Sequence, residues 1–146
     1  MGHIAGKETA NDKIKILEEH MHGPQYVWPA TATSVTLTAT ASAWTHGTIV
    51  EVIAAAAVAD DFDIHHVSIT GISANGEYEI IVYSGPGASE VEIGRAPATR
   101  TAVQSQEGNA PMMTIILPAG TRVSASVASS TGAADTVNVK LIGHLY

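Results

Sequence analysis

The feature that most constrains this chain is a two-residue alternation of apolar and polar side chains, which begins near residue 32 and continues to residue 146. In the segment SVTLTATA, Val35, Leu37 and Ala39 alternate with threonines. Successive side chains of a strand point to opposite faces, so this period is typical of a strand with one buried face. Turn-forming sequences such as SANGE at 73–77 and SGPGAS at 84–89 separate the alternating segments.

Eight or nine short strands with no helix between them predict an all-β fold, either a sandwich or a barrel. About eight strands suit a jelly roll, so we expect an eight- to nine-stranded, jelly-roll-like β-sandwich. The alanine-rich segment 54–59 is interpreted as a loop that crosses between the sheets. The expected strands lie in SVTLTATA, GTIVEVIA, FDIHHVSIT, GEYEIIVYS, SEVEIGRAP, TRTAVQS, MMTIILP, TRVSASVAS and DTVNVKLIGHLY. The alternation places six side chains in the interior: Val67, Ile69, Ile80, Val82, Ile115 and Leu117.

The first 30 residues follow a different pattern. Between residues 6 and 23, three apolar side chains are spaced i, i+3 and i+7, as in the apolar stripe of a short helix. The segment QYVWP then favours an extended conformation, because Pro29 disfavours helical geometry at Trp28. We therefore expect an N-terminal arm over 1–30, with one short helix and an extended strap, followed by a β-sandwich domain over 31–146.

The predicted helix has an apolar face but no partner helix elsewhere in the sequence. We expect the arm to cover this face by reaching a neighbouring subunit, and the alternative is that the helix folds back over its own sandwich. The expected interface residues of the arm are Ile14, Leu17, Met21, Tyr26 and Trp28.

Composition excludes several classes of function. The 146 residues include no cysteine, which excludes disulfides, thiolate zinc sites and cysteine nucleophiles. The formal net charge is −7 and the seven basic residues are scattered singly, so no nucleic-acid partner is expected. The longest apolar run, 49–59, is shorter than the roughly 20 residues of a membrane helix, so no membrane partner is expected either. Only 14% of residues are charged, which fits either a Ser/Thr-rich surface or one covered by other subunits.

The segment DDFDIHH at 60–66 concentrates more reactive side chains than any other. In regular strand geometry His65 and His66 point to opposite faces, so the adjacent pair cannot chelate a metal. Asp63 and His65 have the i, i+2 spacing of two ligands, and a third ligand could come from Glu77 or Glu79. Nothing in the spacing requires one, so we expect no metal ion and interpret Asp63 and His65 as forming local hydrogen bonds.

No enzyme motif is present in the sequence. Cupins combine an HxH motif with a nearby glutamate, whereas here HH replaces HxH and the next glutamate is eleven residues beyond His66. His20 and His22 do read HxH, but residues i and i+2 of a helix face apart. There is no GxSxG elbow, and paired glutamates such as Glu90 and Glu92 fit the outer face of a strand. We therefore expect no enzymatic activity, no catalytic residues and no cofactor.

Several motifs together resemble a group of tailed-bacteriophage virion proteins, and the likeness covers roughly residues 27–146. Members of this group share a W-x-x-G turn, an FDIH strand, a tyrosine-containing hairpin, an EIGR strand and a proline-rich segment ending in P-A-x-(T/S). The matching positions are Trp44–Gly47, Phe62–His65, Asn75–Tyr83, Glu92–Arg95 and Pro111–Thr121. The chain departs from the pattern at Met113 and Thr114, where a proline commonly falls.

The resemblance implies a non-enzymatic component of the virion, similar to small jelly-roll decoration or cement proteins on the capsid exterior. Such a protein is made in the host cytoplasm, binds the major capsid protein and stabilises the shell through subunit contacts. It is expected to be a homo-oligomer, either a dimer or a trimer. The alternative is a receptor- or carbohydrate-binding module of a head or tail fibre, for which Trp28, Trp44 and Tyr146 are the candidate aromatic contacts. A cupin-like metal enzyme is the least favoured reading.

Overall fold

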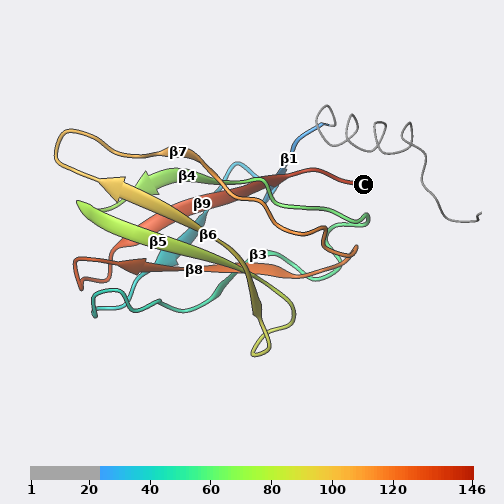
Figure 1. The fold of residues 1–146 in the computed structure, drawn as a ribbon, viewed down its shortest axis with the longest axis horizontal. Coiled ribbons are helices and arrows are strands. Elements are labelled where there is room, and N and C mark those ends of the chain that lie inside the picture. The colour runs from blue at the N-terminus through green and yellow to red at the C-terminus, as the bar shows by residue number, and fades with distance from the viewer. Residues whose placement is uncertain (1–23) are drawn as a thin grey trace, which may run out of the picture.

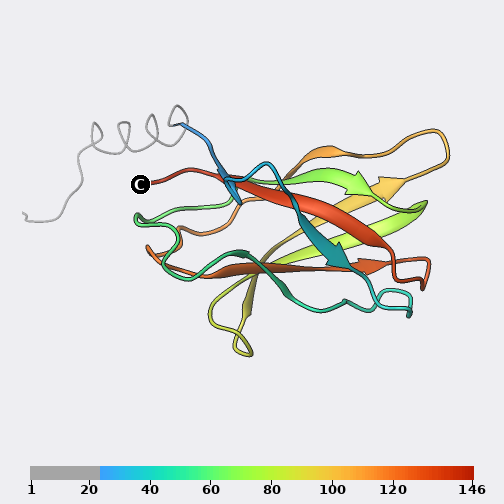
Figure 2. The same cartoon turned by 180° about the vertical axis from the view of Figure 1, so that it is seen from behind.

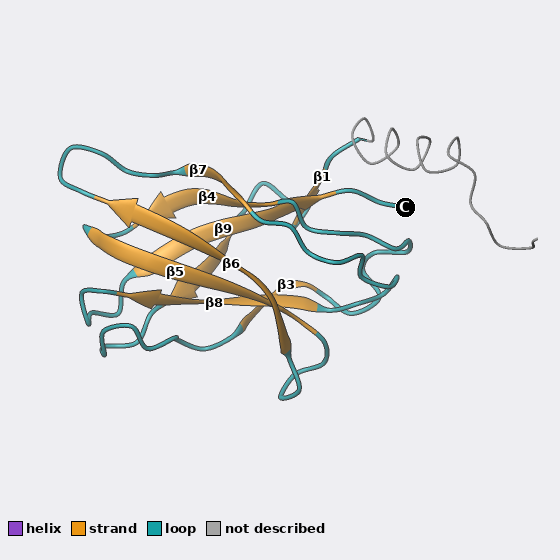
Figure 3. Ribbon diagram, in the orientation of Figure 1, coloured by secondary structure: helices purple, strands orange, loops and turns teal. Residues whose placement is uncertain are grey.

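The structure is a computed structural model that describes residues 24–146. In this part of the chain nine strands form two antiparallel sheets and there is no helix. It follows that the described residues contain no helix long and apolar enough to cross a membrane. Figure 3 shows the strands in orange and the loops in teal. The strands are β1 (Tyr26–Trp28), β2 (Val35–Thr38), β3 (Val50–Ile53), β4 (His66–Ile72), β5 (Gly76–Ser84), β6 (Val91–Arg100), β7 (Gly108–Pro111), β8 (Val123–Ser129) and β9 (Thr136–Gly143).

The sheets lie face to face (Figure 1). One sheet has the order β1-β9-β4-β7, and β2 pairs with β9 beyond the end of β1, as seen from behind in Figure 2. The other sheet has the order β3-β8-β5-β6. The chain therefore crosses between the sheets from β3 to β4, through the alanine-rich segment, and this crossing confirms the loop expected at 54–59.

The core lies between the two sheets and is built from the alternating apolar residues. Val67 and Ile69 of β4 and Ile80 and Val82 of β5 are buried, as expected from the sequence. Leu117 is also buried, although it forms only an isolated bridge with Phe62. Strand β8 is buried at every position, because it lies between β3 and β5 and carries small side chains on its outer face.

The expectation for Ile115 was wrong, since this side chain is 75% exposed. After β7 ends at Pro111, the chain no longer follows strand alternation. The Thr114 hydroxyl instead turns inward and accepts a hydrogen bond from the Ile64 N–H at 3.0 Å. Its neighbour Ile115 is consequently turned outward.

The expected strands TRTAVQS and MMTIILP are also absent from the structure. Strand β6 continues through Pro97 as far as Arg100, and a turn closed by the Thr101 N–H and the Gln104 carbonyl follows. Pro97 is tolerated because β6 is an edge strand, where a missing N–H costs little. On the side away from β9, β4 pairs with GNAP at 108–111, a sequence that reads as a turn.

The predicted helix of the arm, with Ile14, Leu17 and Met21, lies outside the described residues. The strap segment is found in β1, where Tyr26 pairs with Gly143 and Trp28 with Leu141 of β9. The Trp28 ring is half-buried and packs against Phe62 at a centroid distance of 5.5 Å. Tyr26 stacks on Trp28 and is partly exposed.

Candidate functional site

The candidate site lies at the end of the sandwich near Tyr146, where three segments meet beyond the ends of the regular strands (Figure 1). Residues 61–65 form the middle segment. The Asp63 N–H donates to the His144 carbonyl at 3.1 Å, which ties the middle segment to the extension of β9. Residues 112–117 flank the other side through backbone hydrogen bonds to 62–65. Segments distant in sequence are thus held side by side.

The carboxylate of Asp63 is the centre of this site. Its Oδ1 accepts a hydrogen bond from the His144 N–H at 3.0 Å. Its Oδ2 lies 2.7 Å from His65 Nε2 and accepts a hydrogen bond from the Tyr146 hydroxyl at 2.5 Å. The residue is only 2% exposed. Burying a carboxylate is costly unless hydrogen-bond donors or cations compensate the lost hydration. The contacts with His144, His65 and Tyr146 provide this compensation for Asp63.

Gly143 makes this geometry possible. A Cβ atom at this position would lie 1.7 Å from the Asp63 carbonyl oxygen and 3.1 Å from the Trp28 ring. Only glycine lets the two backbones approach so closely. The Asp63 carboxylate, rather than its carbonyl, then accepts the N–H of His144.

The expectation that His65 and His66 face opposite sides was wrong. Their ring centroids lie 6.5 Å apart, too close for side chains on the two faces of one strand. The physical reason is that regular strand geometry begins only at His66, and the irregular backbone at 63–65 turns the His65 ring toward Asp63. The His65 ring also meets the His144 ring edge-on, at a centroid distance of 4.3 Å.

The structure brings a third potential ligand to Asp63 and His65, and that ligand is His144. One ligand atom from each of these three side chains lies within 4.8 Å of the other two. From the sequence we considered Glu77 or Glu79 as the third ligand, but both residues belong to β5 in the other sheet. Glu79 is paired there with His46 at 3.1 Å and with Arg95 at 3.0 Å.

Tyr146 is linked electrostatically to the same carboxylate. Partial burial raises the pKa of the Tyr146 hydroxyl above its usual range, and the hydrogen bond to Asp63 and the negative charge of Asp63 raise it further. The hydroxyl therefore stays protonated as a donor to Asp63 Oδ2. The residue is 42% exposed, so Tyr146 remains in contact with solvent.

Chemically, this cluster offers one carboxylate oxygen and two imidazole nitrogens from a mostly buried position. Such a set can hold a divalent metal ion of the kind that accepts nitrogen ligands. The same atoms can also form a purely structural hydrogen-bond network, and the bonds at 2.5–3.0 Å around Asp63 agree with the local bonding expected from the sequence.

A surface of exposed apolar side chains borders this end of the molecule. Met113, Ile115 and Ile116 are 78%, 75% and 52% exposed, and they follow one another in the segment beside residues 62–65. We call these three residues the apolar edge. Tyr26 and Val27 of β1 are partly exposed on the opposite side of β9.

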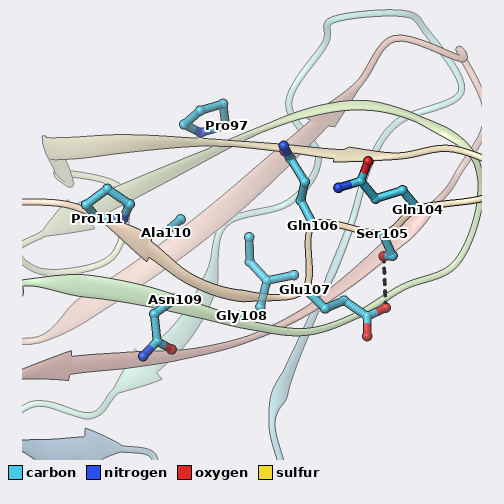
Figure 4. Close-up of a pocket in the computed structure, with 10 residues that line it drawn as sticks. Pro97, Gln104, Ser105, Gln106, Glu107, Gly108, Asn109, Ala110 and Pro111 are labelled. Carbon is cyan, nitrogen blue, oxygen red and sulfur yellow. Dashed lines mark hydrogen bonds between the residues drawn. The ribbon is translucent and has the colours of Figure 1, made fainter.

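A shallow groove of about 530 Å³ runs beside the turn between β6 and β7, as Figure 4 shows. Its lining includes the amides of Gln104, Gln106 and Asn109. Glu107 is the one ionisable side chain among the residues that line it, and its carboxylate accepts hydrogen bonds from the Ser105 hydroxyl and the Ile72 N–H. The groove therefore suits hydrogen bonding more than acid–base chemistry.

No protein-family model matches the chain, and no curated protein or solved structure shows significant similarity to it.

Proposed function

We propose that this chain is a non-enzymatic structural protein of a virion, a capsid decoration protein that binds the major capsid protein and stabilises the shell. The observation that carries the proposal is the apolar edge of Met113, Ile115 and Ile116. Exposed apolar side chains mark a protein contact site when they gather in one patch, and these three lie within four residues of one another. The resemblance of the sequence motifs to phage virion proteins supplies the kind of partner.

We infer that the sandwich is a jelly roll, as such decoration proteins are expected to be. In the described residues β2 pairs with β9, β3 with β8, β4 with β7 and β5 with β6. This pairing is the one expected when a single long antiparallel ribbon folds over itself, as in a jelly roll. The pairing supports this finer assignment within the all-β class.

Burial of the apolar edge provides the binding energy in this proposal. Each large aliphatic side chain that becomes fully buried contributes roughly 1.5–3 kcal/mol. The arm over residues 1–30 adds a second contact to a neighbouring subunit through its expected apolar stripe. Repetition of modest contacts over a symmetric shell, or within a dimer or trimer, multiplies their effect on the particle.

The test is cosedimentation with particles assembled without this protein. Ile115→Asp should weaken binding at least tenfold, since it places a charge in the contact. Val103→Asp is a matched control, because Val103 is 96% exposed but lies in the turn between β6 and β7, away from the apolar edge. Equal binding by both variants and the parent would contradict the proposal. Deletion of residues 1–23 tests the arm separately and should also weaken binding at least tenfold.

A second candidate function is glycan binding, favoured by the surroundings of Trp44. This ring is 53% exposed beside a hollow of about 300 Å³ that Glu77, Glu79, Arg95 and Thr99 also line. Exposed indole beside charged hydrogen-bonding groups is suited to stacking on a sugar. Trp44 also has a φ of 57°, an unfavourable conformation for a bulky residue, and such strain often lies at functional sites.

The other two aromatic candidates are less suitable. Trp28 packs on Phe62 in the core, and the Tyr146 hydroxyl is bonded to Asp63. A glycan array tests the reading, with Trp44→Ala as the variant that should lose any signal. Binding that persists in Trp44→Ala would assign the glycan site elsewhere, and an array without signal would leave decoration as the sole proposal.

A further inference from the structure

We propose that Asp63, His65 and His144 form a binding site for one divalent transition-metal ion, with Zn²⁺ as the best fit. The inference is independent of the proposed decoration function. It reverses the expectation of no metal, which rested on finding only two ligands with suitable spacing. His144 completes a set of two imidazoles and one carboxylate.

The distances suit an ion after a small adjustment. Zn²⁺ bonds to nitrogen and oxygen at about 2.0–2.2 Å, so two ligand atoms of a tetrahedral site lie roughly 3.3–3.6 Å apart. Here Asp63 Oδ2 and His65 Nε2 are 2.7 Å apart, and the other carboxylate oxygen, Oδ1, lies 3.9 Å from His144 Nδ1. One ligand atom from each of the three side chains lies within 4.8 Å of the other two. The Asp63–His65 distance must open by less than about 1 Å, and the other distances within the set must close by at most about 1.5 Å. Rotations of the imidazole side chains can supply movements of this size.

The backbone around the triad is fixed before any ion arrives. The Asp63 N–H donates to the His144 carbonyl, and the His65 N–H donates to the Ile142 carbonyl at 2.7 Å. Gly143, between these two acceptors, permits the close contact with Asp63. Ligands that are held together in advance lose little conformational entropy when they bind an ion.

Further hydrogen bonds orient the carboxylate, as expected around a metal ligand. The Tyr146 hydroxyl donates to Asp63 Oδ2 and the His144 N–H donates to Oδ1. Such outer contacts commonly fix the ligands of protein metal sites and strengthen binding. Asp63 and His144 are buried, so an ion at this position would be largely shielded from solvent.

The donor set selects the class of ion. Ca²⁺ and Mg²⁺ prefer sites made only of oxygen ligands, whereas imidazole nitrogen suits Zn²⁺, Co²⁺, Ni²⁺ and Cu²⁺. The three ligands among the described residues fill three positions of a tetrahedral ion, and the fourth can take water or a further ligand. The ion would join residues 63–65 to the extension of β9, so its binding should stabilise this end of the sandwich.

The test is calorimetric titration of the full chain with ZnCl₂, together with elemental analysis after dialysis. The expected result is one Zn²⁺ per chain, no comparable binding of Mg²⁺ and a rise in Tm of roughly 5–10 °C at 100 times the Kd. His144→Ala should weaken Zn²⁺ binding at least 100-fold. His66→Ala should change it less than threefold, because His66 is adjacent but outside the triad.

The arm also contains histidines, so a double variant His20→Ala/His22→Ala must be included. The proposal predicts that this variant retains the ion. Loss of binding in the arm variant with retention in His144→Ala would overturn it, and so would the absence of stoichiometric Zn²⁺ in the parent. If His144→Ala fails to fold, the absorption spectrum of the parent with added Co²⁺ tests the proposal instead. Visible absorption bands of four-coordinate Co²⁺ that Zn²⁺ displaces are expected in both the parent and the arm variant, and their absence in the arm variant would refute the site.

Discussion

Two carboxylates in the described part of the sandwich, Asp63 and Glu79, lie beside histidines, and their surroundings differ. The pair of Asp63 and His65 is largely buried where regular strand structure ends, with 2.7 Å between the polar atoms. Glu79 of β5 lies 3.1 Å from His46, which belongs to the segment between β2 and β3, and the Glu79 side chain is 36% exposed. Histidine–carboxylate contacts thus occur in a buried setting, at Asp63, and in a partly exposed setting, at Glu79.

The difference lies in what compensates the carboxylate. Glu79 is also paired with Arg95, and the pKa of Glu79 is lowered mainly by the hydrogen bond with His46 and then by Arg95. An arginine stays charged at any ordinary pH, so Glu79 has a permanent cation beside it. Asp63 is surrounded by a tyrosine hydroxyl, a backbone N–H and imidazoles. Imidazole can be a metal ligand and arginine cannot, so the two pairs differ in the chemistry open to them.

The largest effect is expected from Gly143→Ala, which disturbs the backbone around the buried cluster of Asp63, His65 and His144. The added Cβ would overlap the Asp63 carbonyl oxygen at 1.7 Å, and relief would break the bonds between residues 63 and 144. We expect a loss of at least about 3 kcal/mol in the free energy of unfolding, measured by urea denaturation. Gly87→Ala is the control, since its Cβ would approach only Glu90, at 3.9 Å, and it should cost less than about 0.5 kcal/mol. Equal midpoints for the two variants would show that the close approach at Gly143 is not needed.

A direct comparison of the carboxylates comes next. Asp63→Asn removes the charge from a buried acceptor of several hydrogen bonds, and we expect a loss of roughly 2–3 kcal/mol. Glu79→Gln should cost less than about 1 kcal/mol, because solvent screens a partly exposed ion pair. Both are measured by urea denaturation at pH 7 without added metal. A larger loss for Glu79→Gln would reverse the proposed ranking of the two sites.

A smaller effect is expected at high pH from Tyr146. Its pKa is raised in the folded chain, so the unfolded chain releases this proton first as pH rises past about 10. The stability that Tyr146 contributes is thus fully present below pH 10 and is lost above it. Tyr146→Phe should cost about 1 kcal/mol at pH 7 and show a shallower decline of Tm above pH 10 than the parent. Parallel declines of the two proteins would contradict the coupling to Asp63.

The smallest expected effect concerns Glu79 in acid. Because its pKa is lowered by folding, its contribution is present above the ordinary glutamate value of about 4.3 and disappears as pH falls below it. The Tm difference between the parent and Glu79→Gln should therefore be small at pH 7 and vanish near pH 3. A difference that grows toward low pH would show that Glu79 is stabilised in its protonated form.

The sequence predicts the all-β class and most interior positions, because alternation is a local property that burial of one face imposes. Ile80 and Val82 follow it within a regular strand, whereas Ile115 departs from it where Thr114 bonds to Ile64. Such a bond depends on a partner distant in sequence, which alternation cannot reveal.

The candidate site was predictable only in part for the same reason. The spacing of Asp63 and His65 marks two ligands, but His144 joins them through the pairing of β4 with β9. Gly143, the last residue of β9, was a weak signal for this contact, since a glycine in a strand often marks the close approach of another backbone. The position of that other backbone required the structure.

The place of β9 in its sheet has a consequence for how the chain folds. Strand β9 pairs with β1, β2 and β4, yet it follows all of them in the chain. While the protein is being synthesised, β1, β2 and β4 lack the strand that they all pair with until β9 has left the ribosome. Pairings of such long sequence separation make folding slow and leave apolar strands exposed in the meantime. Newly made chains should therefore be most prone to aggregate, or to engage chaperones, in the interval before the last strand is inserted.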